Sequence, residues 1–73
     1  MDERVRHKPD LTSRDIEILL LVGEGLQNKE IAGRLDLSMK TVEFHKHRLY
    51  LKIGVTGGIG AVRFAIREGY MKA

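Results

Sequence analysis

The sequence predicts an all-α fold, with four helices packed as a small bundle-like domain. Apolar residues recur with helical spacing in four segments, and capping residues or glycines bracket these segments. No segment alternates apolar and polar residues with a period of two, so we expect no sheet. Residues 1–10 carry mixed charge and little apolar content. We therefore interpret them as a tail or linker stub, and residues 11–73 as a single domain.

The first predicted helix covers residues 13–23. Thr12 is a favourable N-cap, and Asp15 follows three residues later in a capping-box arrangement that has Asp in place of the usual Glu. Gly25 can take the left-handed conformation that ends many helices. The apolar positions of this segment recur every three or four residues, which is the spacing of one buried helix face.

Two further helices follow, separated by a short turn. Gln27 or Asn28 can cap a helix over 28–35, and Ser38 is a good N-cap for a helix over 39–53. Helical spacing also indicates which residues of the domain lie inside. The residues expected to be mostly buried are Ile18, Leu19, Val22, Ile31, Leu35, Val42, Leu49 and Val55.

A fourth helix is predicted over 59–68. Its expected inner side consists of Ala61, Val62, Ala65 and Ile66. That pattern leaves Phe64, with Arg63 and Arg67 beside it, to face solvent. Each glycine inside a helix costs about 1 kcal/mol, so we expect this helix to start late or to fray. The glycines concerned are Gly57, Gly58 and Gly60.

The positive charge gathers in the C-terminal half of the chain. Residues 11–37 carry three basic and five acidic side chains, a net charge of −2. Residues 38–53 carry four basic side chains against one acidic, a net charge of +3, and residues 54–73 add +2. A polyanion is the natural partner for such a patch. A solvated basic helix face is the alternative interpretation.

The second and third predicted helices form a helix-turn-helix pattern, in which the second helix is long and basic. A major groove about 12 Å wide admits a helix. In such a pair the first helix lies across the DNA backbone and the second enters the groove. Ala32 is small enough to let the helices approach closely, and Val42 faces back to fix their angle. Residues 39–53 are therefore the expected recognition helix.

Four stretches of the chain resemble a known family. They are Leu11–Asp15 (LTSRD), Gly25–Ala32 (GLQNKEIA), Leu37–His45 (LSMKTVEFH) and Lys52–Val55 (KIGV). They are similar to the LuxR/GerE-type helix-turn-helix, the C-terminal output domain of quorum-sensing regulators and of NarL/FixJ response regulators. The resemblance covers nearly the whole chain after the tail. It implies four helices and a sequence-specific bacterial transcription factor that usually acts as a dimer.

The resemblance implies that Glu43, Phe44 and His47 read bases, with Arg48 beside them. Glu43 stands where Lys or Arg is common in the family. An acid there can accept a hydrogen bond from a cytosine amino group, but it repels phosphate. Phe44 lies well off the inner side of its helix. We expect it to contact a thymine methyl group or to act as a partly buried support, with simple core packing as the remaining alternative.

Phosphate contacts are implied at two helix starts. Asn28 and Lys29 match phosphate-binding positions at the start of the second helix, where backbone N–H groups also attract anions. Lys40, Thr41 and His45 match positions that hold phosphates or set the start of the recognition helix. Together with the base-reading set, these residues make up the expected DNA interface.

The fourth helix is implied as the dimer contact, through Phe64, Arg63 and Arg67. One exposed aromatic cannot provide the roughly 800 Å² per partner of a stable interface, and the arginines would repel their symmetry mates. We therefore expect a monomer or weak dimer that pairs on DNA, where two half-sites hold two copies together. The family usually has a polar stretch where the three glycines stand, and a Ser or Thr where this chain has Gln27.

Other classes of function find no support in the sequence. His45 and His47 lie about 200° apart on a helix and cannot chelate one metal together. There are no cysteines, so neither a disulfide framework nor a cysteine zinc site is expected. No catalytic constellation appears, so we expect neither an enzyme nor a cofactor. The longest apolar run, Ile18–Val22, is far short of the roughly 20 residues that span a bilayer, and the expected location is the cytoplasm.

The expected partners are double-stranded DNA, a second copy of the chain on DNA, and either RNA polymerase or an N-terminal receiver or ligand-binding domain. The alternative is a protein-interaction module, in which the helix-turn-helix pairs with other regulators or polymerase and scarcely touches DNA. Salt-dependent DNA binding separates the two, because only phosphate contacts release counterions. Leu20, on the side of its helix opposite the core, is either a scattered exposed leucine or a contact with such a partner.

Overall fold

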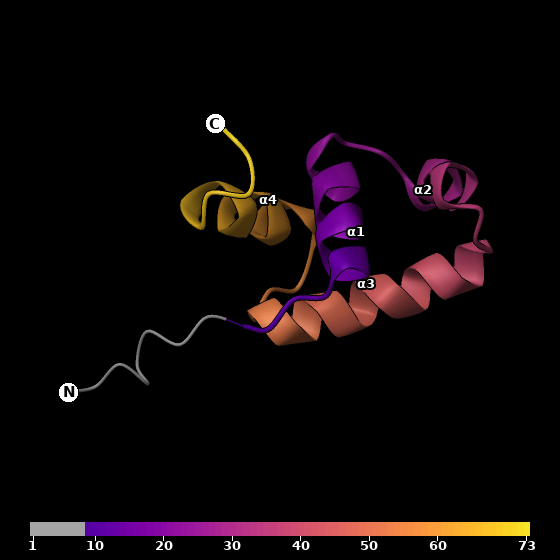
Figure 1. Ribbon diagram of the computed structural model, residues 1–73, viewed down its shortest axis with the longest axis horizontal. Coiled ribbons are helices and arrows are strands. Elements are labelled where there is room, and N and C mark those ends of the chain that lie inside the picture. Colours follow the sequence, from indigo (N-terminus) through magenta and orange to yellow (C-terminus); the bar gives the residue numbers. More distant parts are fainter. Residues whose placement is uncertain (1–8) are drawn as a thin grey trace.

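The computed structural model describes residues 9–73, and over that range the chain forms four helices and no strand (Figure 1). The helices are α1 (Ser13–Gly23), α2 (Asn28–Leu35), α3 (Met39–Ile53) and α4 (Gly58–Arg67). The predicted all-α class and the predicted bounds of α1, α2 and α3 are confirmed. α4 begins and ends one residue earlier than predicted, so the glycines do not delay its start. Residues 1–8 of the expected tail lie outside the described residues.

Capping residues start the first three helices where the sequence predicts. The hydroxyl of Thr12 accepts a hydrogen bond from the N–H of Asp15 over 3.0 Å, and the Asp15 carboxylate accepts one from the N–H of Thr12 over 2.9 Å. The predicted capping box is therefore present. At α2 the N-cap is Gln27, whose N–H donates to Oε1 of Glu30 over 2.7 Å. The predicted N-cap of α3, Ser38, is also confirmed.

A tight turn joins α2 to α3. Asp36 closes it in the left-handed region with φ 56°, a conformation that aspartate tolerates better than most residues with a side chain. The N–H of Leu37 then donates to the carbonyl oxygen of Ala32 over 2.9 Å, which satisfies one of the last carbonyls of α2. The two helices pack directly against each other. The predicted helix-turn-helix is therefore present.

The apolar core lies around α1, which contacts each of the other three helices (Figure 1). Leu35 and Val55 were expected in this core but are only half-buried at its edge. Leu35 ends α2 and Val55 follows the end of α3, so each has packing neighbours on fewer sides. The buried hydrophobic residues are Ile18, Leu19, Val22, Ile31, Ala32, Val42, Leu49, Ala61, Phe64 and Ala65.

The rotation of α4 about its own axis differs from the prediction. Phe64 is only 4% exposed, whereas Ile66 is 36% exposed. The expectation that Phe64 faces solvent and Ile66 the core is therefore wrong. After α4, Gly69 turns the chain with φ 84°, and the ring of Tyr70 stacks on that of Phe64 with 6.1 Å between centroids. This C-terminal segment adds a packing surface that the helical pattern of α4 does not reveal.

An ion pair joins the start of α1 to the end of α3. The carboxylate of Asp15, a residue only 7% exposed, accepts a 2.6 Å hydrogen bond from Nζ of Lys52. The same Nζ donates to the carbonyl oxygen of Asp10 over 3.2 Å. Burial alone would raise the pKa of Asp15, but hydrogen bonds from Lys52 and Thr12, with the charge of Lys52, hold that pKa below its usual value. The pair therefore fixes α3 against the helix at the centre of the fold.

Candidate nucleic-acid interface

α3 turns one face to the core and the opposite face to solvent. Val42 and Leu49 are fully buried and define the inner side. Phe44 follows Val42 by two residues, so it points about 200° away around the helix. It is 58% exposed, and Leu51, seven residues further along on the same face, is 68% exposed. A helix of 15 residues with a free face along its whole length can enter a groove.

The structure brings the expected base-reading residues together on this free face. Glu43, Phe44, His47 and Arg48 are all exposed. The guanidinium carbon of Arg48 lies 5.6 Å from the centroid of the Phe44 ring. That distance allows a cation–π contact one helical turn apart. The free face therefore combines an anion, a cation, an imidazole and an apolar ring.

The expected phosphate-contacting residues at the start of α3 have different surroundings. Lys40 is exposed. Thr41 is half-buried, and its hydroxyl accepts a 2.8 Å hydrogen bond from the hydroxyl of Ser38. Its side chain therefore helps to set the start of α3. His45 is half-buried, and its ring lies 6.0 Å from that of Phe44 in an edge-to-face arrangement. Of the three, Lys40 is the one that projects into solvent.

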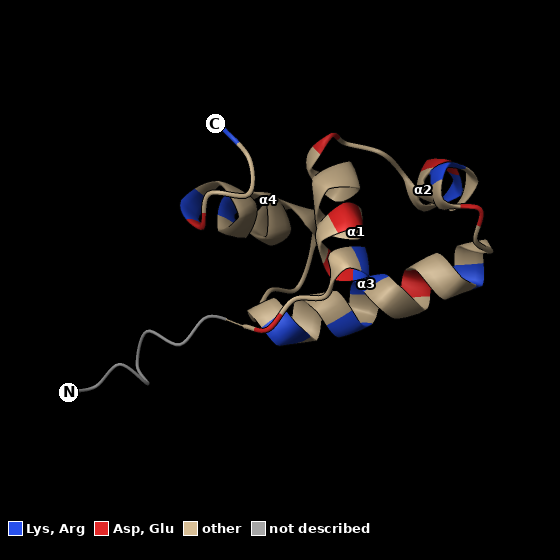
Figure 2. Cartoon of the chain, in the orientation of Figure 1, with Lys and Arg blue, Asp and Glu red and all other residues tan. Residues whose placement is uncertain are grey.

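The four basic residues of α3 are not equally available to a ligand. Figure 2 shows basic positions recurring along the ribbon of α3 from its first turn to its last. Lys40 and Arg48 are exposed. Lys52 is held by Asp15, and Lys46 donates a 2.8 Å hydrogen bond to Oδ1 of Asn28 at the start of α2. Two of the four charges are therefore engaged within the chain.

Lys46 lies beside the candidate interface, and the sequence did not single it out. Its position, four residues after Val42 and three before Leu49, lies near the buried stripe of α3, where a lysine must reach outward to find a polar partner. Its Nζ atom also lies 6.0 Å from the centroid of the Tyr50 ring. Its bond to Asn28 ties α3 to the start of α2. A lysine within an otherwise apolar stripe is the signal that could have identified it.

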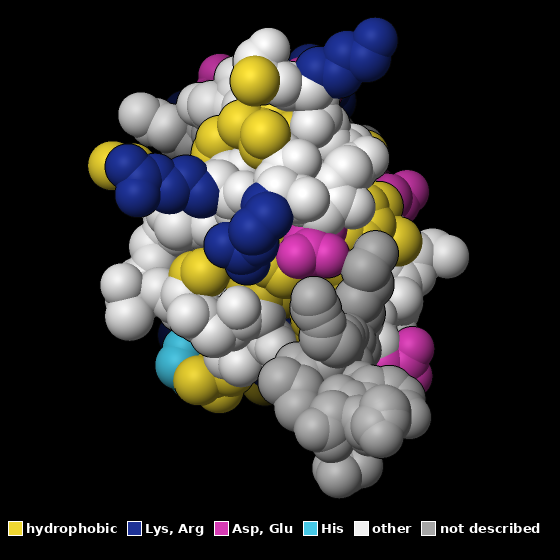
Figure 3. All heavy atoms as spheres, turned by 90° about the vertical axis from the view of Figure 1, so that its left-hand side faces the viewer, with side chains coloured by type: hydrophobic (Ala, Val, Ile, Leu, Met, Phe, Trp, Pro, Cys, Tyr) yellow, Lys and Arg dark blue, Asp and Glu magenta, His cyan; other side chains and the backbone are white. Residues whose placement is uncertain are grey.

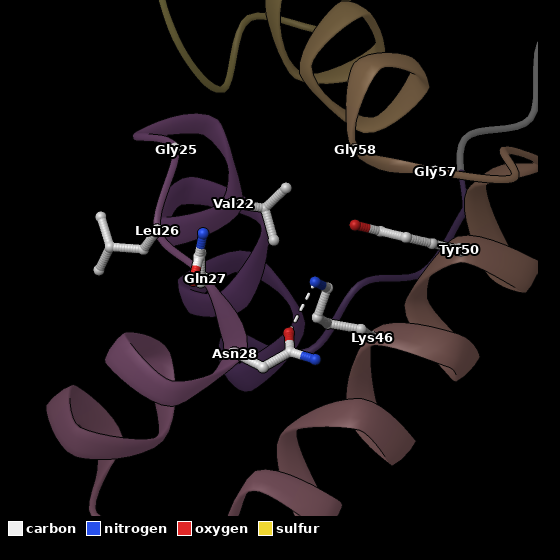
Figure 4. A pocket seen from close by; sticks show the side chains of 9 residues that line it. All are labelled: Val22, Gly25, Leu26, Gln27, Asn28, Lys46, Tyr50, Gly57 and Gly58. Carbon is white, nitrogen blue, oxygen red and sulfur yellow. Dashed lines mark hydrogen bonds between the residues drawn. The ribbon is translucent and has the colours of Figure 1, made fainter.

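Lys46 and Tyr50 line a pocket where α1, α2, α3 and α4 approach one another (Figure 4). Its volume is about 550 Å³, and Gly57 and Gly58 form its wall at the start of α4. The hydroxyl of Tyr50 points into the space between Val22 and this wall (Figure 4). Burial raises the pKa of Tyr50, whose phenol is protonated at neutral pH even at its ordinary pKa of about 10. The pocket thus presents a hydroxyl and an ammonium group beside the start of α2.

Leu20 lies outside this pocket. It is half-buried and lines a shallow groove between α1 and α2 together with Leu21 and Leu35. Glu17, Glu24 and Arg34 line it as well. The expectation that Leu20 points away from the main core agrees with this position, because Leu20 is not among the buried core residues.

Residues 9–73 carry neither a cluster of metal-binding side chains nor a single helix that could cross a membrane. No group of three or more His, Cys, Asp or Glu side chains is placed to hold a metal ion in that range. No single helix there is long and apolar enough to cross a membrane, and α3 and α4 meet such a criterion only when taken together across a bend of 54°. Part of the apolar content of α3 and α4 lies in the core that they share with α1.

Comparison with known proteins identifies the family. Residues 9–65 match the family described as bacterial regulatory proteins, luxR family, so the chain belongs to that family of helix-turn-helix transcription regulators. The resemblance inferred from the sequence is confirmed. This family is a class of DNA-binding regulatory domains and not a class of enzymes.

Individual relatives are response regulators. The uncharacterized response regulatory protein YgeK of Escherichia coli (strain K12) is 48% identical over 81% of this chain and 40% of its own length. Response regulator Rre1 of Synechocystis is 44% identical over 85% of this chain and 27% of its own length. The crystal structure of response regulator ChrA, from a heme-sensing two-component system, superposes with a TM-score of 0.80 and 33% identity over 94% of this chain and 35% of that one. The chain therefore spans less than half the length of these relatives.

Proposed function

We propose that this domain binds double-stranded DNA sequence-specifically, with α3 in the major groove. The observation that carries the proposal is the free face of α3. It combines hydrogen-bonding, charged and apolar side chains, as base reading requires. α2 would lie across the DNA backbone, with Lys29 exposed in its first turn and Lys40 exposed in the first turn of α3. These two lysines are the phosphate contacts we propose.

The residues already bonded within the domain would position the reading face. Asn28 and Lys46 hold α3 at a defined distance from α2. Thr41 and His45 support the first turns of α3. We therefore assign to these residues the orientation of the interface, and to Glu43, Phe44, His47 and Arg48 the contacts with the groove.

We propose that two copies pair on DNA through the outer face of α4. Ile59 is 77% exposed and Ile66, seven residues later on the same face, is 36% exposed. Arg63 is exposed between them. Figure 3, which looks at the end of the molecule that carries α4, shows hydrophobic side chains open to solvent beside basic ones. Arg67 packs on the Phe64 ring and pairs with Glu68, so its head group is already engaged.

The cellular setting follows as part of the same proposal. A regulator of transcription acts where the bacterial chromosome lies, which is the cytoplasm. The relatives are response regulators, and a receiver domain and RNA polymerase are the protein partners that this kinship supports. Within such an assembly, this domain would supply the contact with DNA.

Selection of binding sites from a random pool of duplexes tests the proposal. We expect one enriched half-site motif, repeated with two-fold symmetry. Lys29→Ala and Lys40→Ala should weaken binding to specific and random duplexes alike, and each should lower the slope of log affinity against log salt by about 0.9, which is the value of one phosphate contact. Glu24→Ala, an exposed acid at the end of α1, is the control and should leave the slope unchanged.

Two results would contradict the proposal. An unenriched pool with salt-independent binding would instead indicate a protein-interaction module. Unchanged salt slopes in both lysine variants would remove α2 and the start of α3 from the interface, even where DNA is bound.

A further inference from the structure

Phe44 is unusual for its position in the fold. It occupies the sixth position of α3, on the second turn, and points away from the core with 58% of the residue exposed. An exposed aromatic ring leaves a large apolar area in contact with water, so the isolated domain lacks the free energy that burying this area would contribute. The side chains around it on the free face are polar or charged. Phe44 therefore provides an apolar contact surface within a polar face.

The ring of Phe44 is held in place although it is exposed. Arg48 covers it from one turn further along, 5.6 Å from its centroid. The ring of His45 meets it at 6.0 Å with an interplanar angle of 63°. Two such contacts restrict the side chain without burying it. An ordered apolar group loses less conformational entropy when it binds than a mobile one does.

The major groove offers few apolar groups to such a ring. The C5-methyl group of thymine is the apolar feature of the groove edge, and side chains such as Phe contact it. Cytosine carries the same group only when it is methylated at C5. We propose that Phe44 contacts the C5-methyl group of a pyrimidine, and so makes this domain prefer a methyl-bearing base at one position of each half-site.

This inference rests on the proposed function, because it requires α3 to lie in the major groove. Helix-turn-helix proteins contact base edges with the N-terminal part of the second helix, which is where Phe44 lies. Leu51 shares the free face and is 68% exposed. It follows seven residues later, about 10 Å along the helix axis, beyond the turns that read bases. Leu51 is therefore a matched apolar control.

The experiment removes the methyl group and nothing else. In the motif obtained from the random pool, each thymine is replaced in turn by deoxyuridine, which keeps every hydrogen-bonding group and lacks only the C5-methyl. We expect one position per half-site at which the replacement weakens binding about fourfold, the value of one methyl group removed from water. Phe44→Ala should bind the thymine and deoxyuridine duplexes equally. Leu51→Ala should keep the wild-type difference.

A second pair of duplexes separates the two sources of the methyl group. At the sensitive position, a C·G pair and a 5-methylcytosine·G pair are compared. Affinity for the methylated pair should exceed that for the unmethylated pair in wild type and in Leu51→Ala, but not in Phe44→Ala. Equal affinity for these two pairs, beside a clear deoxyuridine effect, would restrict the preference to thymine.

The outcomes distinguish failure of this inference from failure of the proposed function. Sequence-specific binding that is unaffected by deoxyuridine at every position would overturn the inference alone. A deoxyuridine effect that persists in Phe44→Ala would assign the methyl contact to another residue and also overturn it. An absence of DNA binding would overturn the proposed function, and with it the premise. Because Phe44 is exposed, Phe44→Ala should unfold at the wild-type temperature. An unchanged unfolding temperature would show that the effect of this substitution on binding arises at the interface.

Discussion

Replacing Lys52 with methionine tests the ion pair that fixes the recognition helix to α1. The change keeps the apolar stem of the side chain and removes the ammonium group that lies 2.6 Å from the Asp15 carboxylate. The side chain of Asp15 is only 9% exposed, so the carboxylate would lose its cation without regaining water. A hydrogen bond to a charged group contributes about 1.5–3 kcal/mol. We expect Lys52→Met to lower the free energy of unfolding by about 2 kcal/mol at pH 7.

That loss is large for a domain of this size. A domain of 73 residues has a free energy of unfolding of roughly 4–11 kcal/mol at typical values per residue. A change of about 2 kcal/mol should lower the melting temperature by about 8–16 °C. Urea unfolding followed by circular dichroism measures the free energy, and a thermal scan measures the melting temperature. Lys29→Met, which removes an exposed lysine, is the matched control and should change neither.

The pH dependence of this loss of stability tests whether the ion pair is its cause. The pKa of Asp15 is lowered in the folded state, so the stabilisation is fully present above the ordinary carboxyl pKa of about 3.9 and is lost as pH falls through the lowered pKa. The difference between wild type and Lys52→Met should therefore shrink toward zero as the pH falls below the lowered pKa. A Lys52→Met variant within about 0.5 kcal/mol of wild type at pH 7, where surface substitutions usually fall, would refute the reasoning. A difference in the free energy of unfolding between wild type and Lys52→Met that stayed constant with pH would also refute it.

Three further predictions concern how far individual positions of α2 and α4 are buried. Gly33→Ala should raise the free energy of unfolding, measured in urea, by about 1 kcal/mol. A Cβ at this position meets no atom within 4 Å, and alanine favours helix more than glycine does. A lower free energy of unfolding would show that α2 is not helical at this residue. Phe64→Ala should lower the free energy of unfolding by about 3–5 kcal/mol, because it leaves a cavity where a buried ring was. An unchanged free energy of unfolding, together with weaker pairing of two copies on DNA, would instead mean that the ring is exposed. Ile59→Gln should leave the melting temperature unchanged but reduce pairing on a duplex with two half-sites in sedimentation, whereas undiminished pairing would exclude this face of α4.

Local sequence signals accounted for the secondary structure of this protein. A capping box at Thr12, an N-cap at Ser38 and glycine after α3 each act over four residues or fewer, so the sequence alone reveals them. The buried faces of α1 and α3 follow from spacing for the same reason. The outward position of Phe44 was also visible, because two residues from a buried Val42 is half a turn of helix.

The orientation of α4 depended on tertiary structure. Two faces of that helix carry apolar residues, so spacing alone could not choose between Phe64 and Ile66 for the core. The chain after Gly69 decides the choice, because Tyr70 returns to stack on Phe64. A contact between a helix and the segment beyond its turn is not encoded in the periodicity of the helix.

The sequence by itself determined the fold class, the helix-turn-helix and the set of residues on its recognition helix, because each depends on residues close together in the chain. Only the tertiary structure decided which of the cations remain free. Lys46 and Lys52 look equivalent to Lys40 in a count of charges, yet they are bonded to Asn28 and Asp15, 18 and 37 residues away in the chain. Such pairings arise when helices pack, and packing is a property of the whole domain.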